Sequence, residues 1–152
     1  MDLTHLFDLT NRSILITGGT GVLGVGMAEG LVAAGANVAV LARTPAKAEA
    51  TLARLAGGPG RALAVSGDVL DRASLEAAAA QAGNDLAAIV VSAFKHHLAV
   101  DQALPTPEFA RAARALCDKT GAALVLDEVR AGLRLHDGGS WELVGVRPDL
   151  SA

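Results

Sequence analysis

The sequence predicts an α/β fold in which a three-layer, doubly wound parallel sheet of five strands, or six, has the order 3-2-1-4-5. Three observations predict it. Short apolar, β-branched segments alternate with alanine-rich helical segments, as in parallel sheets buried on both faces. A glycine-rich turn joins the first strand to the first helix. The 152 residues, 51% of them apolar and 3% aromatic, suit one domain (1–152) whose core is built from small aliphatic side chains.

The first three strand–helix units follow from local signals. Residues 14–17 form a β-branched strand, and residues 22–34 form a helix that ends before Gly35. Residues 37–41 form the second strand, after which Pro45 occupies the favoured first position of a helix over 45–55. Residues 62–66 and 72–82 form the third strand and helix. Right-handed crossovers then place the strands in the stated order.

The second half continues the alternation less regularly. Residues 87–92 and 122–126 form the fourth and fifth strands, and residues 107–119 form the helix between them, which stops near Gly121. Residues 131–148 are glycine-rich and without clear period, so we expect irregular structure with one helical turn at 141–144. A sixth strand can begin within 148–152.

The glycine-rich turn carries the first chemical argument. Gly18 permits a tight turn, Gly21 lets the backbone approach a pyrophosphate, and Gly24 lets the helix pack on the strand. Free N–H groups and the positive end of the helix then face the phosphates. The expected phosphate cradle comprises Gly18, Gly19, Thr20, Gly21, Leu23 and Gly24.

Two further positions indicate which dinucleotide the turn would bind. After the second strand, where a carboxylate would bind the ribose hydroxyls, stand Ala42 and Arg43. A guanidinium there favours a 2′-phosphate, hence NADP over NAD, by roughly 10–100-fold for one charge-assisted contact. Asp68 and Val69 follow the third strand, where they would contact the adenine edge.

Residues 1–82 resemble the first half of a short-chain dehydrogenase/reductase. The resemblance rests on Phe7-Asp8-Leu9, the turn from Thr17 to Gly24, Leu41-Ala42-Arg43 and Asp68-Val69. It implies phosphate contact by the turn, 2′-phosphate contact by Arg43 and adenine contact by Asp68. The alternative is a glycine turn retained only to pack a helix on a strand.

The catalytic residues of that family are not found. Its carbonyl reduction needs a tyrosine with a lysine four residues later, whereas this chain has no tyrosine, and its lysines are Lys47, Lys95 and Lys119. The fourth strand ends in Ser92-Ala93-Phe94 where the family has an Asn-Asn-Ala-Gly-like motif. We therefore expect no catalytic residues of this type.

Residues 83–152 resemble a slice of a class III pyridoxal-phosphate-dependent aminotransferase of the glutamate-semialdehyde aminomutase type. The similar segments are 107–121, 124–129, 132–134 and 139–150. The resemblance implies that Asp127 corresponds to the aspartate that pairs with the pyridine nitrogen. The family's Schiff-base lysine would follow residue 152, so we expect neither transamination nor pyridoxal phosphate binding, and no cofactor role for Asp127.

Resemblance to two different families within one predicted sheet indicates an engineered or recombined chimera, joined near residues 80–88. Its expected function is to bind a nicotinamide dinucleotide, NADP in preference to NAD, without turnover. The alternatives are a structural scaffold with a vestigial site, a homodimer through an edge strand, and residual oxidoreductase activity through Ser92 or His97. A natural homologue spanning residues 60–110 would contradict the chimera.

Charge and composition exclude other classes. A net charge of −3 disfavours nucleic-acid binding, and no apolar segment is long enough for a membrane span. We expect the one cysteine, Cys117, to be a small buried apolar side chain. A single cysteine cannot form an intramolecular disulfide, so we expect a reducing cytoplasm. We expect a monomer or homodimer and no metal site, with His96 and His97 in a solvated loop, and Arg111 and Arg114 on the solvated face of their helix.

Overall fold

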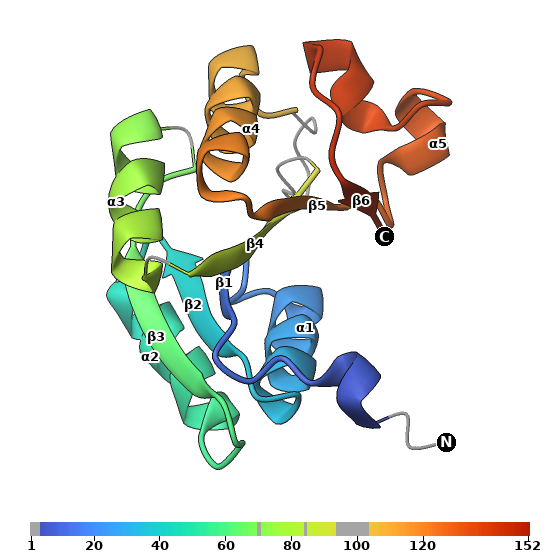
Figure 1. Cartoon of the computed structure of the whole chain (residues 1–152). Coiled ribbons are helices and arrows are strands. Elements are labelled where there is room, and N and C mark those ends of the chain that lie inside the picture. The colour runs from blue at the N-terminus through green and yellow to red at the C-terminus, as the bar shows by residue number, and fades with distance from the viewer. Residues whose placement is uncertain (1–3, 70, 84, 94–103) are drawn as a thin grey trace.

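The computed structural model describes residues 4–69, 71–83, 85–93 and 104–152, and within them one parallel sheet has the order β3-β2-β1-β4-β5-β6 (Figure 1). All five pairings of neighbouring strands are parallel. The predicted order is confirmed, and the sixth strand adds beside β5. The strands are β1 (Ser13–Thr17), β2 (Asn37–Ala42), β3 (Arg61–Ser66), β4 (Leu86–Ser92), β5 (Ala123–Asp127) and β6 (Leu150–Ser151).

Helices cover both faces of this sheet, which confirms the three layers. On one face α1 (Val22–Ala33) and α2 (Pro45–Leu55) contribute Ala28, Val32 and Leu55 to a core with Ile14 and Ile16 of β1. On the other, α3 (Arg72–Ala82) and α4 (Pro107–Thr120) pack on a larger core centred on β4 and β5. The side chains of these cores are mainly Ala, Val, Leu and Ile, as the composition predicts.

The ends of α4 follow the expected signals. The Thr106 Oγ1 accepts a hydrogen bond from the Phe109 N–H at 3.2 Å, and Pro107 occupies the first turn. At the other end Gly121 has a φ of +74°, in the left-handed region that glycine adopts without a Cβ penalty. Local sequence therefore sets where this helix begins and ends.

The C-terminal segment is more ordered than expected. Besides the predicted helical turn, which is the 3₁₀ helix η2 (Ser140–Val144), a one-turn helix α5 (Gly132–Leu135) is present, and a 3₁₀ turn η1 (Thr4–Phe7) precedes β1. Single turns are too short to show a hydrophobic period, so the sequence did not reveal α5 or η1.

Trp141 holds this segment against the sheet. Its side chain is fully buried, and its Nε1–H donates a hydrogen bond to the Ala93 carbonyl oxygen at 3.0 Å. The ring also meets that of Phe109 of α4 edge-on, with centroids 6.3 Å apart. The segment thereby packs on both α4 and the end of β4.

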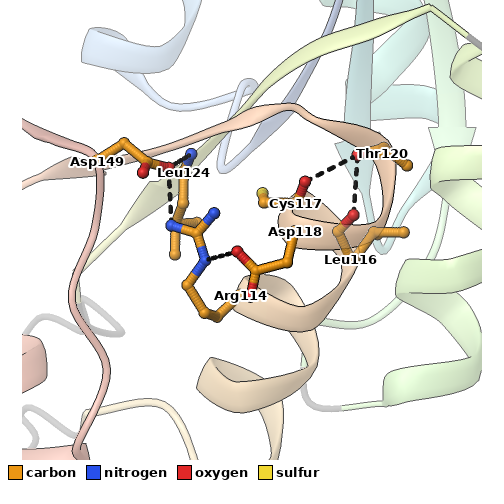
Figure 2. Close-up of polar contacts among 7 residues, drawn as sticks. All are labelled: Arg114, Leu116, Cys117, Asp118, Thr120, Leu124 and Asp149. Atoms are coloured by element: carbon orange, nitrogen blue, oxygen red, sulfur yellow. Dashed lines mark hydrogen bonds and ion pairs between the residues drawn. The ribbon is translucent and has the colours of Figure 1, made fainter.

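The expectation that Arg114 lies on a solvated helix face is wrong, whereas Arg111 is exposed. The Arg114 Nη1 donates to the Asp149 Oδ2 at 2.7 Å, and its Nε lies 2.9 Å from the Asp118 Oδ1 (Figure 2). The Leu124 N–H donates to the same Asp149 oxygen at 2.7 Å. Asp149 thus links α4, β5 and the segment leading to β6, a long-range arrangement that helical periodicity does not predict.

Replacing Asp149 should lower stability in a pH-dependent way. Its pKa is lowered by the Leu124 N–H and then by the Arg114 guanidinium, so its stabilising effect is present above the unfolded value near 3.8 and lost as the pH falls through the lower folded pKa. We expect Asp149→Ala to reduce the free energy of unfolding by about 1–2 kcal/mol at pH 7. Urea unfolding followed by circular dichroism should show this difference shrinking below about pH 4. An equal difference at pH 7 and pH 3 would contradict it.

Candidate functional site

A pocket of about 260 Å³ opens at the carboxyl ends of β1, β4 and β5, beside the first turn of α1. In a doubly wound sheet, ligands bind where the chain's direction across the sheet reverses, which here is between β1 and β4. The pocket lies at that reversal and is mostly apolar, with charged side chains on one side. Its lining comprises Ile16, Thr17, Gly18, Gly21, Val22, Leu23, Gly24, Met27, Val90, Ser92, Asp127 and Arg130.

The glycine-rich turn has the geometry that its residues predict. Gly18 has a φ of +70°, and the Gly21 N–H donates to its carbonyl oxygen at 3.0 Å, which closes a tight turn. A Cβ on Gly24 would collide with the Gly18 carbonyl oxygen and lie 2.7 Å from the Gly19 Cα. Only hydrogen fits at position 24, because the helix packs directly on the turn.

Two polar side chains of the strand ends lie behind this turn. The Thr17 hydroxyl donates to the Val90 carbonyl oxygen at 3.2 Å, which ties the end of β1 to β4. A Cβ on Gly18 would lie 3.3 Å from the Ser92 Oγ, so this hydroxyl sits against the turn itself. Ser92 is therefore a polar group of the pocket, at the position where the sequence places the end of the fourth strand.

The predicted adenosine-binding residues lie outside the pocket lining. Arg43 follows β2 and is exposed, while Asp68 follows β3 and is half-buried. The Gly67 N–H donates to the Ala42 carbonyl oxygen at 3.2 Å, which joins the ends of these two strands. The side chain of Val69 packs against the core. These residues share the carboxyl edge with the pocket, and their contact with a ligand stays a prediction.

Of the expected phosphate cradle, Gly18, Gly21, Leu23 and Gly24 line the pocket, whereas Gly19 and Thr20 belong to the same turn without lining it. A Cβ on Gly19 would lie 2.9 Å from Val40 Cγ1, so this glycine faces the sheet. Four of the six cradle residues therefore line the cavity, and the other two form part of the turn without lining it.

Arg130 is a pocket residue that sequence reasoning did not name, and Asp127 was named only as the counterpart of the aminotransferase aspartate, not as part of this pocket. Asp127 pairs in register with Ser92 at the ends of β5 and β4, and its Oδ1 accepts a hydrogen bond from the Val129 N–H at 3.3 Å. A strand-end carboxylate beside the predicted cleft was the available signal for Asp127. No local pattern distinguishes Arg130 from other exposed arginines, because its position depends on the turn after β5.

The buried side chain of Glu128 holds the turn after β5 in place. Its Oε1 accepts hydrogen bonds from the Ser140 N–H at 2.9 Å and the Ser140 hydroxyl at 3.0 Å, and its own N–H donates to the Ala152 carbonyl oxygen at 2.7 Å. The N–H groups of Ala131 and Gly132 donate to the Glu128 carbonyl oxygen. Asp127 and Glu128 therefore face opposite sides, as expected for neighbours at a strand end.

Other candidate groups give no competing site in the described part of the chain. Among the residues that the structure describes, no three His, Cys, Asp or Glu side chains gather to hold a metal. His96 and His97 lie outside the described residues. Cys117 is buried, and burial raises the pKa of its thiol to about 11, so the thiol stays protonated at neutral pH.

No helix in the described ranges has the length and apolar content to cross a membrane.

Comparisons with known proteins relate the chain to two families. Aminopentol aminotransferase of Sphingopyxis macrogoltabida is 48% identical over 81 residues, which are 53% of this chain and 19% of that protein. Glutamate-1-semialdehyde 2,1-aminomutase of Neisseria meningitidis serogroup C (strain 053442) is 42% identical over 79 residues, or 52% of this chain and 18% of that enzyme. The chain spans about a fifth of the length of these curated relatives.

Solved structures add the second family. A short-chain type dehydrogenase/reductase from Mycobacterium marinum superposes with a TM-score of 0.64 at 26% identity, covering 84% of this chain and 59% of that one. The Pseudomonas aeruginosa RhlG/NADP active-site complex superposes with a TM-score of 0.53 at 31% identity, covering 62% and 38%. The family model for short chain dehydrogenases matches residues 12–92, which include the whole glycine turn and β4. Because that match covers more than half of its residues, the chain belongs to the short chain dehydrogenase family, and it is similar as well to aminotransferases of the glutamate-semialdehyde aminomutase type.

Proposed function

We propose that this chain binds a nicotinamide dinucleotide, NADP in preference to NAD, and does not turn it over. The observation that carries the proposal is the turn between β1 and α1, where Gly24 leaves no room for a Cβ and where Gly18 and residues 21–24 border the pocket. Such a turn presents N–H groups and the positive end of a helix to a phosphate. The residues present therefore fit a pyrophosphate. The similarity to a solved complex that contains NADP supports the same ligand class.

The preference for NADP rests on the end of β2. Arg43 is exposed there and directly follows Ala42, so a guanidinium and no carboxylate stands at the strand end. The hydrogen bond from Gly67 to Ala42 brings the segment that carries Asp68 beside it. Arg43 would bind the 2′-phosphate and Asp68 would accept from the adenine edge.

The proposal that the cofactor is not turned over rests on the absence of tyrosine from the sequence and on the described side chains of the pocket. A bound nicotinamide would supply hydride transfer, which needs a proton donor such as a tyrosine, and the chain has none. The polar side chains of the pocket are those of Thr17, Ser92, Asp127 and Arg130. Neither Lys47 nor Lys119 lines it. Among the described residues, neither lysine therefore offers pyridoxal phosphate a partner in the pocket, and Lys95 lies outside the described residues.

An engineered or recombined origin accounts for the two similarities. The family model ends at residue 92, whereas the aminotransferase relatives match about half of the chain. β4 pairs in parallel with β1 and with β5, so one strand joins the dehydrogenase-like part (1–82) to the aminotransferase-like part (83–152). Main-chain hydrogen bonds make this ladder, and they tolerate a change of side chains.

Titration with NADPH and with NADH tests the proposed function. We expect saturable binding, seen as quenching of Trp141 fluorescence and as heat, with NADPH at least about tenfold tighter than NADH. Arg43→Ala should remove that difference, because NADH has no 2′-phosphate to lose. Arg111→Ala, which removes an exposed arginine from α4, is the matched control and should leave both affinities unchanged. No heat and no quenching at millimolar cofactor would instead support the scaffold with a vestigial site.

A further inference from the structure

We propose that Arg130, on the turn after β5, is a second anion-binding residue of the pocket and contacts the pyrophosphate held by the glycine turn. The inference rests on the proposed function and extends it to a residue beyond the dehydrogenase match at 12–92. Under this proposal both parts of the chain contribute to the binding site: the glycine turn comes from residues 1–82 and Arg130 from residues 83–152. The ligand chemistry it names is a diphosphate.

The placement of Arg130 supports this role. It lines the same 260 Å³ pocket as Gly21, Val22 and Gly24, so a cation and the positive end of α1 border one cavity. Arg130 is exposed, and no carboxylate of a described residue pairs with it, whereas Arg54, Arg72, Arg114 and Arg147 each form an ion pair. Its guanidinium is therefore available to a ligand.

The turn also limits the freedom of the backbone that carries Arg130. The Asp127 Oδ1 holds the Val129 N–H on one side, and the Glu128 carbonyl oxygen accepts from the Ala131 and Gly132 N–H groups on the other. The Glu128 side chain is in turn buried against Ser140. A preorganised backbone reduces the entropy lost when a side chain engages a ligand.

The charges of the pocket favour a diphosphate. A planar guanidinium and several backbone N–H groups together match the oxygens of two linked phosphates. Asp127 places a negative charge in the same pocket, and this charge repels an anion. The positive charge of Arg130 offsets that repulsion. Asp127→Asn keeps an oxygen for the Val129 N–H and removes the charge, so we expect it to strengthen diphosphate binding a few-fold.

Two probes and three variants test the assignment. Inorganic pyrophosphate and NADPH would each be titrated by calorimetry into the wild type, Arg130→Ala, Arg130→Lys and Arg134→Ala. Arg134 is exposed on α5, four residues away and outside the pocket lining, so its variant is a charge-matched control. We expect Arg130→Ala to weaken both probes about tenfold, Arg130→Lys to recover most of that loss, and Arg134→Ala to change neither by more than about twofold.

Salt dependence separates a charge contact from a structural effect. The difference in pyrophosphate affinity between wild type and Arg130→Ala should shrink at 0.5–1 M NaCl. The screening length is then about 3–4 Å, so the attraction between exposed charges is weakened. Thermal unfolding without ligand should give the same midpoint for both proteins.

Each outcome decides between the two proposals. Equal pyrophosphate binding by wild type and Arg130→Ala overturns the role of Arg130, whatever NADPH does. Pyrophosphate binding that depends on Arg130, without NADPH binding, supports the anion site and overturns the dinucleotide function. A wild type that binds neither probe overturns both.

Discussion

Gly24→Ala should abolish measurable dinucleotide binding and destabilise the protein by about 2–3 kcal/mol. The added methyl group would collide with the Gly18 carbonyl oxygen and lie 2.7 Å from the Gly19 Cα. Neither atom belongs to a flexible side chain, so α1 or the turn must move. Urea unfolding measures the loss of stability, and NADPH titration measures the loss of binding.

Gly26→Ala is the matched control for that variant. Gly26 lies two residues further along α1, and a Cβ there meets nothing within 4 Å. Both substitutions replace a helical glycine by alanine, and Gly26 lies in open space, so we expect Gly26→Ala to stabilise the protein by about 0.5–1 kcal/mol and to leave binding unchanged. Two variants with the same stability and affinity would show that the close contact at Gly24 does not shape the turn.

Trp141→Ala is expected to cost about 3–5 kcal/mol, a large share of the stability of a domain of this size. The indole is fully buried, packs on Phe109 and donates its Nε1–H to the Ala93 carbonyl oxygen. Removing it leaves a cavity between the segment around η2 and the end of β4. Circular dichroism in urea is the suitable probe, since the variant loses the only tryptophan.

Trp141→Phe separates the two contributions of the indole. Phenylalanine keeps an aromatic ring against Phe109 but has no N–H, so we expect a smaller cost of about 1–2 kcal/mol. A cost below about 1 kcal/mol for Trp141→Ala would mean that the C-terminal segment contributes little to the folded state. A cost as large for phenylalanine as for alanine would assign the effect to the hydrogen bond alone.

The central strands and the four long helices could be predicted from the sequence because their signals are local. Pro45 and Pro107 begin α2 and α4, Gly35 and Gly121 follow the ends of α1 and α4, and β-branched segments lie between the helices. The structure moves the predicted ends of these elements by at most one residue. The one-turn helix α5 and the ion pairs of Arg114 were missed, because they depend on how residues distant in sequence pack.

The candidate site divides in the same way. The glycine turn is a local pattern, and its backbone geometry follows from Gly18 and Gly24. Asp127 and Arg130 enter the pocket only because β5 pairs in register beside β4, with Ser92 opposite Asp127. Register between strands some 35 residues apart cannot be read from either segment alone. The sequence therefore indicated Ser92, which ends a predicted strand, but it did not place Asp127 or Arg130 in the pocket.

The position of β4 also has a consequence for synthesis of the chain. β1 hydrogen-bonds to β2 on one side and to β4 on the other, and Ser13 pairs with Leu86. While a ribosome is still making residues 43–85, the main-chain groups on one edge of β1 have no partner strand, and the three central residues of β1 (14–16) are apolar. We expect aggregation of nascent chains, and its suppression by chaperones, to matter most in this interval, since an unpaired strand edge invites pairing with other chains. Emergence of β4 closes that edge, so codon changes that slow translation before residue 86 should lower the soluble yield more than changes after it.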